Sequence, residues 1–258
     1  MEYLEAHGKL IISVYILLIF ILERIIYKNY FKMDILSNTK LRLLKNISFG
    51  ILVKVVIPIF IIYIVKNLQD IYLWKLPQNW LIYLIDILVL DLSLYWFHFY
   101  AHKNPLIWKF HEIHHSDNIL DSTTGLRIHF TEPVIALLFK LPAIFILAIP
   151  VKIYILYEII LTIVGVFHHS NIKVPLLIDK YVGAVVALPS THCVHHHATP
   201  QDTNSNYGFV FLFWDVLFGT LNKVERQKNW KYGLKYAEDK AFIKLLYYPF
   251  TNKHFRNL

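Results

Sequence analysis

Five apolar runs dominate the pattern of hydrophobic and polar positions along the chain. They cover residues 10–27, 47–65, 81–97, 133–149 and 151–167, with polar or basic segments between most of them. Runs of about 17–25 apolar residues are long enough for a helix to cross a bilayer. The first three runs predict membrane-spanning helices, and the last two, joined at Pro150, predict a short helical hairpin. We therefore predict an all-α integral membrane protein of one domain with about four transmembrane helices.

The amino-acid composition supports a membrane protein. Hydrophobic residues make up 56% of the 258 positions and charged residues only 17%, which is too apolar for an ordinary soluble domain. The net charge of +8 does not indicate a nucleic-acid partner, because the basic residues lie where anionic lipid head groups would meet them. The single cysteine, Cys193, excludes an intrachain disulfide and a cysteine-based metal site. The acidic start of the chain predicts no cleaved signal peptide.

The distribution of basic residues predicts the orientation in the membrane. The polar segment 24–46 carries six of them, whereas the segment 66–79 carries only Lys66 and Lys75. The six are Arg24, Lys28, Lys32, Lys40, Arg42 and Lys45. The positive-inside rule places segment 24–46 in the cytosol. The third apolar run then ends on the cytosolic side, and the hairpin begins and ends there too.

Histidines concentrate between residues 98 and 197, a stretch that holds twelve of the fourteen in the chain. They form an HxxxH motif, two HxxHH motifs and an adjacent pair. The members are His98 and His102; His111, His114 and His115; His192, His195 and His196; and His168 with His169. On a helix, residues three and four apart share a face, so HxxxH can point two imidazoles at one metal and HxxHH can point three. Neutral imidazole binds zinc, copper, iron and nickel well, so this stretch predicts a metal site rather than histidines scattered on polar faces.

The sequence around these histidines resembles the fatty acid hydroxylase / sterol desaturase superfamily of membrane di-iron enzymes. The resemblance covers about residues 86–220 and rests on the histidine motifs and a few flanking words. These words are Asp91 to His102, Trp108 to Ser116, Arg127-x-His129-x-x-Glu132, Phe167-His168-His169-Ser170-Asn171, Pro189 to His196, Asn206-Tyr207-Gly208 and Trp214-Asp215.

The resemblance implies a non-haem di-iron centre in a cytosolic, histidine-rich helical cap. It implies two iron ions as cofactors, and O₂ with two electrons to hydroxylate or desaturate a lipid C–H bond. The implied metal ligands are His98, His102, His111, His114, His115, His169, His192, His195 and His196. The family commonly has one further, variable ligand, for which His168 is the nearest candidate. We interpret His129 as structural or as a support for a ligand.

Two polar residues are candidates for supporting roles. Asp91 lies seven residues before His98, about two helical turns on nearly the same face, where a carboxylate can accept the second N–H of an imidazole. An ionisable group in an apolar run is costly and therefore a functional candidate, although a hydrogen bond to another helix explains it equally well. Asn206 is a candidate contact for the metal site or its water, and its alternative is a turn, for which Asn-Tyr-Gly is well suited.

Three hypotheses follow for the function. The first is an O₂-dependent lipid hydroxylase or desaturase, since oxidising an unactivated C–H bond requires a redox cofactor. The chain contains no haem, flavin or iron–sulfur motif, so this hypothesis predicts a separate reductase with a ferredoxin or cytochrome partner. The second is a metal-binding or transport protein, which would place its ligands near mid-membrane. The third, a zinc hydrolase, fits poorly, because zinc sites use three or four ligands.

Overall fold

The computed structural model describes residues 2–26, 39–69, 74, 76–77, 79–227, 229–234, 236 and 240–251. Its regular elements over these residues are all helical, as the sequence predicts, and the only strand-like pairs among them are two isolated bridges. The elements are α1 (Glu2–Ile26), α2 (Thr39–Ile51), the π-helical turn η1 (Leu52–Val56), α3 (Ile57–Gln69), α4 (Trp80–Lys103), α5 (Pro105–His115), the 3₁₀ turn η2 (Ser122–Leu126), α6 (Thr131–Ile146), α7 (Val151–His168), α8 (Leu176–Tyr181), α9 (Pro189–His195), α10 (Pro200–Thr203), α11 (Phe213–Leu217) and α12 (Phe242–Thr251).

Three helices within the described residues are long and apolar enough to cross a membrane. They are Lys40–Gln69, which combines α2, η1 and α3, and the helices α4 and α7. The sequence predicts about four spans, and the apolar runs assigned to α1 and α6 are not among these three. Residues 27–38, about half of the basic segment 24–46 that predicts the orientation, lie outside the described residues.

The second predicted span is one long helix that accommodates a proline. Pro58 lacks an N–H group and its ring clashes with the carbonyl four residues earlier, which belongs to Lys54. The helix widens to a π turn there, and the Ile57 N–H bonds to the Leu52 carbonyl, five residues back. The apolar helix therefore continues from Thr39 to Gln69 across Pro58 instead of breaking.

A tight turn between α4 and α5 folds the first histidine motif onto the second. Asn104 ends α4 in an extended conformation (φ −107°, ψ 116°), as expected before a proline. Its side chain accepts a hydrogen bond from the Leu106 N–H at 2.8 Å and so caps α5, with Pro105 at the first helical position. This turn brings the His98 ring within 4.8 Å of the His111 ring, measured between centroids.

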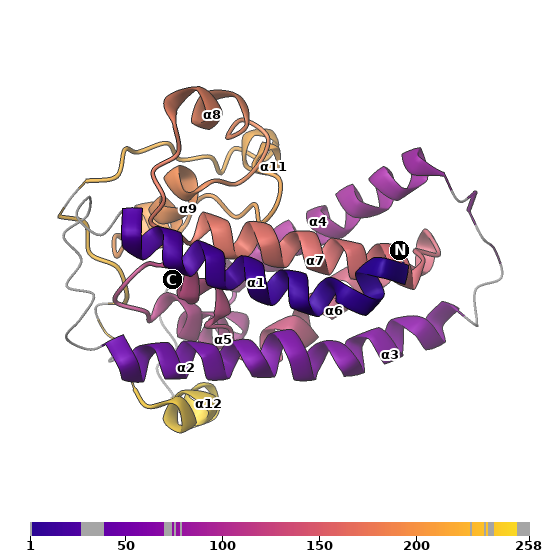
Figure 1. The fold of residues 1–258 in the computed structure, drawn as a ribbon, viewed down its shortest axis with the longest axis horizontal. Coiled ribbons are helices and arrows are strands. Elements are labelled where there is room, and N and C mark those ends of the chain that lie inside the picture. Colours follow the sequence, from indigo (N-terminus) through magenta and orange to yellow (C-terminus); the bar gives the residue numbers. More distant parts are fainter. Residues whose placement is uncertain are drawn as a thin grey trace.

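The long helices lie along the long axis of the molecule, and α8, α9 and α11 gather towards one end (Figure 1). The main apolar core lies between α3, α4, α6 and α7, where Leu90, Phe97, Ile144 and Tyr157 are almost fully buried. The C-terminal end of α7 reaches the same end of the molecule as α9. The histidines of four segments therefore meet at that end.

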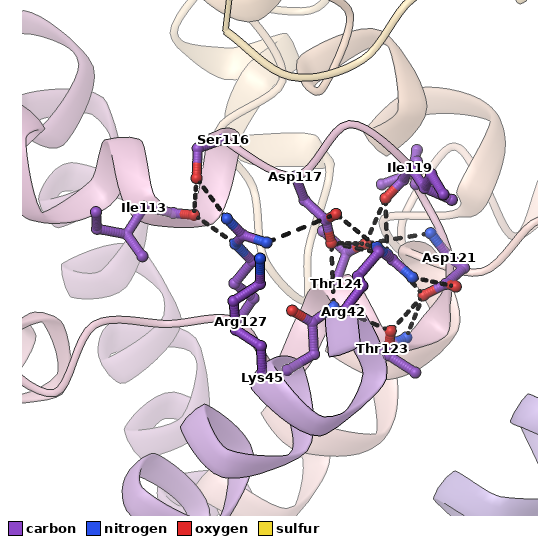
Figure 2. Close-up of polar contacts among 12 residues, drawn as sticks. Arg42, Lys45, Ile113, Ser116, Asp117, Ile119, Asp121, Thr123, Thr124 and Arg127 are labelled. Carbon is purple, nitrogen blue, oxygen red and sulfur yellow. Dashed lines mark hydrogen bonds and ion pairs between the residues drawn. The ribbon is translucent and has the colours of Figure 1, made fainter. Parts of the chain in front are cut away.

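A buried network of charged side chains joins α2 to the segment between α5 and η2 (Figure 2). Arg42 donates two hydrogen bonds to the Asp117 carboxylate, at 2.6 and 2.7 Å, and another to Asp121 at 2.8 Å. The Arg127 Nε atom donates to the Ile113 carbonyl at 2.9 Å. Burial alone would raise the pKa of Asp117, but Arg42 and Arg127 outweigh it and lower the pKa to about 2. The second histidine motif, which ends two residues before Asp117, is thus tied to α2.

Candidate metal centre

Nine of the ten predicted histidine ligands lie in two compact groups. In each group one ring nitrogen from every residue lies within 4.8 Å of the others, and all nine residues are buried. Group 1 consists of His98, His102, His111, His115 and His195, and group 2 consists of His114, His169, His192 and His196. The groups are neighbours, since the rings of His115 and His196 stack with centroids 4.5 Å apart.

Each HxxHH motif divides its histidines between the two groups. His111 and His115 belong to group 1 and His114 to group 2, whereas His192 and His196 belong to group 2 and His195 to group 1. At 3.6 residues per turn, residues i and i+4 differ by about 40° around the helix axis, while i+3 lies about 60° to the other side. The sequence led us to expect three imidazoles directed at one metal, and the structure instead gives two to one group and one to the other.

Fixed partners hold the Nδ1 atoms of several ligands. Four of these partners are backbone carbonyls: Tyr207 O for His98 at 2.8 Å, Arg127 O for His114 at 3.1 Å, Gly165 O for His169 at 2.5 Å and Ser205 O for His195 at 2.7 Å. A carbonyl can only accept a hydrogen bond, so each of these Nδ1 atoms carries the proton. The Nε2 atom of each ring then has no proton, and its lone pair is available to a metal, as metal-ligating histidines require.

The Nε2 atoms of group 2 lie close together, and no proton lies between those of His114 and His169. His169 Nε2 lies 3.1 Å from His114 Nε2, and both rings carry their proton on Nδ1. His169 Nε2 is also 3.0 Å from His192 Nε2 and 3.1 Å from His196 Nε2. Two lone pairs at this distance repel, and a cation between them turns the repulsion into coordination.

Group 1 shows a similar close approach of ring nitrogens. His98 Nε2 lies 3.1 Å from His111 Nε2, and the buried Nε2 atoms of His115 and His195 have no hydrogen-bond partner within the described residues. A buried polar atom without a partner is costly. The donor sets of both groups therefore fit a metal ion.

Burial keeps the imidazoles neutral. Burial lowers the pKa of His111 to about 3, and burial together with His111 lowers the pKa of His114 to about 4. Burial and the neighbouring histidines hold the pKa values of His115 and His196 well below the usual value. Only the neutral ring has a lone pair for a metal, so both groups are in the ligand form at neutral pH.

His168 lies outside both groups. Its ring stacks on His192 with centroids 3.8 Å apart, and its residue is fully buried at the end of α7. Its assignment as the variable ligand stays a prediction. His129 also lies outside the groups and is 2.7 Å from the Thr131 hydroxyl and 3.1 Å from the Leu246 carbonyl of α12, which matches a structural role.

Asp91 contacts other helices, with no histidine among its hydrogen-bond partners within the described residues. It accepts from the Tyr157 hydroxyl at 3.0 Å, the Trp214 indole at 3.0 Å and the Val210 and Phe211 N–H groups at 3.3 and 3.2 Å. This is the alternative that the sequence left open. Its assignment as a catalytic residue stays a prediction, and the structure shows it joining α4 to α7 and to the segment before α11.

Asn206 forms a turn that presents two of the carbonyls described above. It adopts a left-handed conformation, with φ of +54°, and its side chain donates to the Thr191 carbonyl of α9 at 2.9 Å. The residues on either side, Ser205 and Tyr207, offer their carbonyls to His195 and His98 of group 1. Asn206 thus acts on the histidines through its neighbours' backbone. Its assignment as a contact of the metal site or its water stays a prediction.

Glu132 is a site residue that the sequence analysis did not select. Its Oε2 atom lies 2.6 Å from His111 Nδ1, and its Oε1 atom accepts from the His129 N–H at 3.1 Å. Burial raises the pKa of Glu132 to about 7, against the opposing effect of His114. The signal was present in the Arg127-x-His129-x-x-Glu132 word, whose Arg127 carbonyl and Glu132 carboxylate each hold one histidine of the second motif.

These observations define a helical membrane protein with two neighbouring histidine groups whose donor atoms fit a metal ion. Comparison with known families then gives a specific class. The sequence model of the fatty acid hydroxylase family matches residues 83–220, more than half of the chain. The chain belongs to the fatty acid hydroxylase family, as the resemblance predicts. No solved structure matches the chain.

Several curated proteins are similar to this chain. Ornithine lipid hydroxylase OlsE of Rhizobium tropici is 25% identical over 66% of the chain and 50% of its own length. Alkylglycerol monooxygenase of Xenopus tropicalis is 30% identical over 67% of the chain and 37% of its own length. Very-long-chain aldehyde decarbonylase GL1-5 of rice (Oryza sativa subsp. indica) is 27% identical over 60% of the chain and 26% of its own length. The matched region therefore spans half or less of each of these relatives.

Proposed function

We propose that the protein is an O₂-dependent di-iron membrane oxygenase that hydroxylates or desaturates a lipid C–H bond. The observation that carries this proposal is the pair of adjacent groups of neutral, buried imidazoles at one end of the apolar helices. Zinc is redox-inert and closes its sites with three or four ligands, whereas nine histidines divided between two groups suit a pair of redox metals. Bound iron would supply the oxidising power for a C–H bond, which side chains alone do not have.

The chain itself fixes the ligands and excludes water. Carbonyls of Arg127, Gly165, Ser205 and Tyr207 hold Nδ1–H groups, so four rings have one tautomer and one orientation before any metal enters. The Tyr207 ring covers the group 1 side, with its centroid 5.3 Å from that of His102. All nine histidines are at most 4% exposed. Such a site protects reactive chemistry from solvent.

The relatives support a lipid as the substrate. Two of their names, ornithine lipid hydroxylase and alkylglycerol monooxygenase, give a lipid substrate and an oxygen-insertion reaction. The three helices that are long and apolar enough to cross a membrane support a substrate with acyl chains. Sterols, fatty acyl chains, sphingolipids, carotenoids and ether lipids all remain candidates.

We further propose that the site faces the cytosol and takes electrons from a separate protein. The six basic residues of segment 24–46, which runs from the end of α1 into α2, support the orientation through the positive-inside rule. The absence of any flavin, haem or iron–sulfur motif in the sequence supports a separate reductase with a ferredoxin or cytochrome-type donor. Nothing in the chain's charge pattern favours nucleic acid as a partner.

The second candidate function is a membrane metal-binding or transport protein with the same histidines. It would need no electron donor and no O₂. The position of His98 and His102 in the last turns of α4, rather than at its middle, argues against transport through the membrane.

The test is a turnover assay on the iron-loaded protein in lipid vesicles with a reductase, a ferredoxin and a cellular lipid extract. Mass spectrometry should find a lipid that gains one oxygen atom, or one that loses two hydrogen atoms. His196→Ala should abolish the product, and the matched variant His197→Ala should retain it. His197 lies outside both groups and stacks on Trp230 with centroids 4.1 Å apart. No oxidised lipid from any extract, with both metals bound, would favour the metal-binding function.

A further inference from the structure

The short helices α8 and α11 turn their apolar side chains outward and their acids inward. Leu176, Leu177 and Leu217 are 82%, 72% and 66% exposed. In contrast, Asp179 of α8 accepts a hydrogen bond from the Ser190 hydroxyl, and Asp215 of α11 is fully buried. Helices that face water show the opposite pattern, with the polar face outside.

The two helices share one surface, which we call the α8–α11 face. The segments beside them are joined by an antiparallel bridge between Val186 and Phe211 and by a hydrogen bond from the Leu212 N–H to the Val185 carbonyl at 2.8 Å. Figure 1 shows the two helices beside each other. The exposed apolar members of the face are Leu176, Leu177, Ile178, Tyr181, Val182, Val185, Val216, Leu217 and Phe218.

Contacts with α4 indicate how deep in the membrane this face lies. The Trp214 indole of α11 donates to Asp91 at 3.0 Å, and the Phe218 ring lies 4.8 Å from the Trp96 ring. Asp91 is at the middle of the 24-residue helix α4. It lies seven residues before His98, about 10 Å along the axis at 1.5 Å per residue. Since α4 is long and apolar enough to cross a membrane, an element bonded to its middle lies at the level of the acyl chains.

The charge at the edge of the face agrees with this position. Lys180 of α8 is exposed, and its ammonium group lies 5.4 Å from the centroid of the Tyr181 ring. A lysine beside an aromatic ring at the edge of an apolar face is typical of segments at the membrane interface, where the ammonium group reaches the head groups.

We propose that the α8–α11 face is inserted in the lipid leaflet beside α4, so that this part of the cap is embedded in the bilayer rather than standing clear of it in water. Its partner is the acyl region of the leaflet. The inference rests on the packing of these helices and not on the metal or the reaction.

The proposal gives the leaflet a short route to the histidines. The Phe218 ring at the edge of the face stacks on Tyr95 with centroids 5.1 Å apart, and Tyr95 lies 6.2 Å from Tyr207. Tyr207 in turn lies 5.3 Å from His102 of group 1. Two aromatic rings therefore separate Phe218, at the lipid-facing edge, from the metal-binding group.

Spin labels on single introduced cysteines test the proposal on the full chain in phosphatidylcholine and phosphatidylglycerol vesicles. The native Cys193 is only 1% exposed, so the chain without an introduced cysteine should take up no label. Leu177→Cys and Leu217→Cys report on the face. Leu84→Cys, on the exposed side of α4, is the lipid control, and Glu225→Cys, on an exposed loop, is the water control.

Power saturation then compares collisions of each label with O₂, which concentrates in lipid, and with a water-soluble nickel chelate. We expect the labels at 177 and 217 to match Leu84→Cys, with strong O₂ and weak nickel collisions. Strong nickel collisions like those of Glu225→Cys would overturn the proposal, because the face would lie in water. Weak collisions with both reagents would also overturn it, because a second copy or another protein would then cover the face.

Discussion

Gly125 allows the backbone of η2 to lie close to His169 of group 2, and Gly125→Ala should weaken metal binding there. A Cβ atom at this position would lie 3.0 Å from His169 Nδ1 and 3.0 Å from the Gly165 carbonyl oxygen. These two atoms form the contact that fixes the His169 ring. The Gly165 carbonyl or the His169 ring must therefore move by a few tenths of an ångström to make room for the methyl group. This movement exceeds the roughly 0.2 Å by which metal–ligand distances vary.

The expected effect follows from the role of that contact. Loss of a partner that orients a ligand typically costs about 10–100-fold in metal affinity, which corresponds to about 1.4–2.7 kcal/mol. The effect should be confined to group 2, since His169 is not a member of group 1.

The assay is anaerobic titration of metal-free protein with Fe²⁺ against a competing chelator, fitted to two sites. Gly165→Ala is the matched control, because a Cβ atom there meets nothing within 4 Å. We expect it to bind both metals as the wild type does, with unchanged or slightly higher thermal stability. The reasoning would be refuted by wild-type affinity at both sites in Gly125→Ala, or by equal losses in the two variants.

Three further predictions concern the residues around the histidines. Glu132→Gln should lower the affinity of group 1 about 10–100-fold, since His111 loses its carboxylate partner; the same titration measures it, and an unchanged group 1 would contradict it. Asn206→Ala should reduce metal binding by group 1 more than Asn206→Gly does, because glycine tolerates the φ of +54°; equal metal content in both variants would argue against the turn. Arg42→Ala should destabilise the fold by about 3–5 kcal/mol, because the buried Asp117 carboxylate loses both of its short bonds to Arg42 and retains the Arg127 guanidinium at 3.8 Å. Lys40→Ala on the exposed side of α2 should change thermal unfolding little; similar unfolding of the two variants would exclude the network as a stabilising element.

The helical class and nearly all of the histidine set were predictable from the sequence. Apolar runs of spanning length and the i, i+3 and i+4 spacing of histidines are local patterns, and both appear directly along the chain. The π turn that lets the helix continue across Pro58 was harder to predict, because it depends on how the neighbouring carbonyls are hydrogen-bonded.

The partners that orient the histidines were largely beyond sequence reasoning. Four of the acceptors are backbone carbonyls, which every residue possesses, so the residue types of Gly165 and Ser205 do not mark them as acceptors. The pair Arg42 and Asp117 joins positions 75 residues apart, and no local pattern connects them. Glu132 was the exception, since the Arg127-x-His129-x-x-Glu132 motif was visible in the sequence. The motif gave no indication of which histidine Glu132 would contact.

The metal content of the protein tests the central claim most directly. Protein purified anaerobically from iron-replete cells, or reconstituted with Fe²⁺, should contain two irons per chain that are oxidised on adding O₂. His115→Ala of group 1 and His192→Ala of group 2 should each lose iron, and His197→Ala should keep both ions. A wild-type protein that binds no redox metal after reconstitution, or a His115→Ala or His192→Ala variant that retains two irons, would contradict the account.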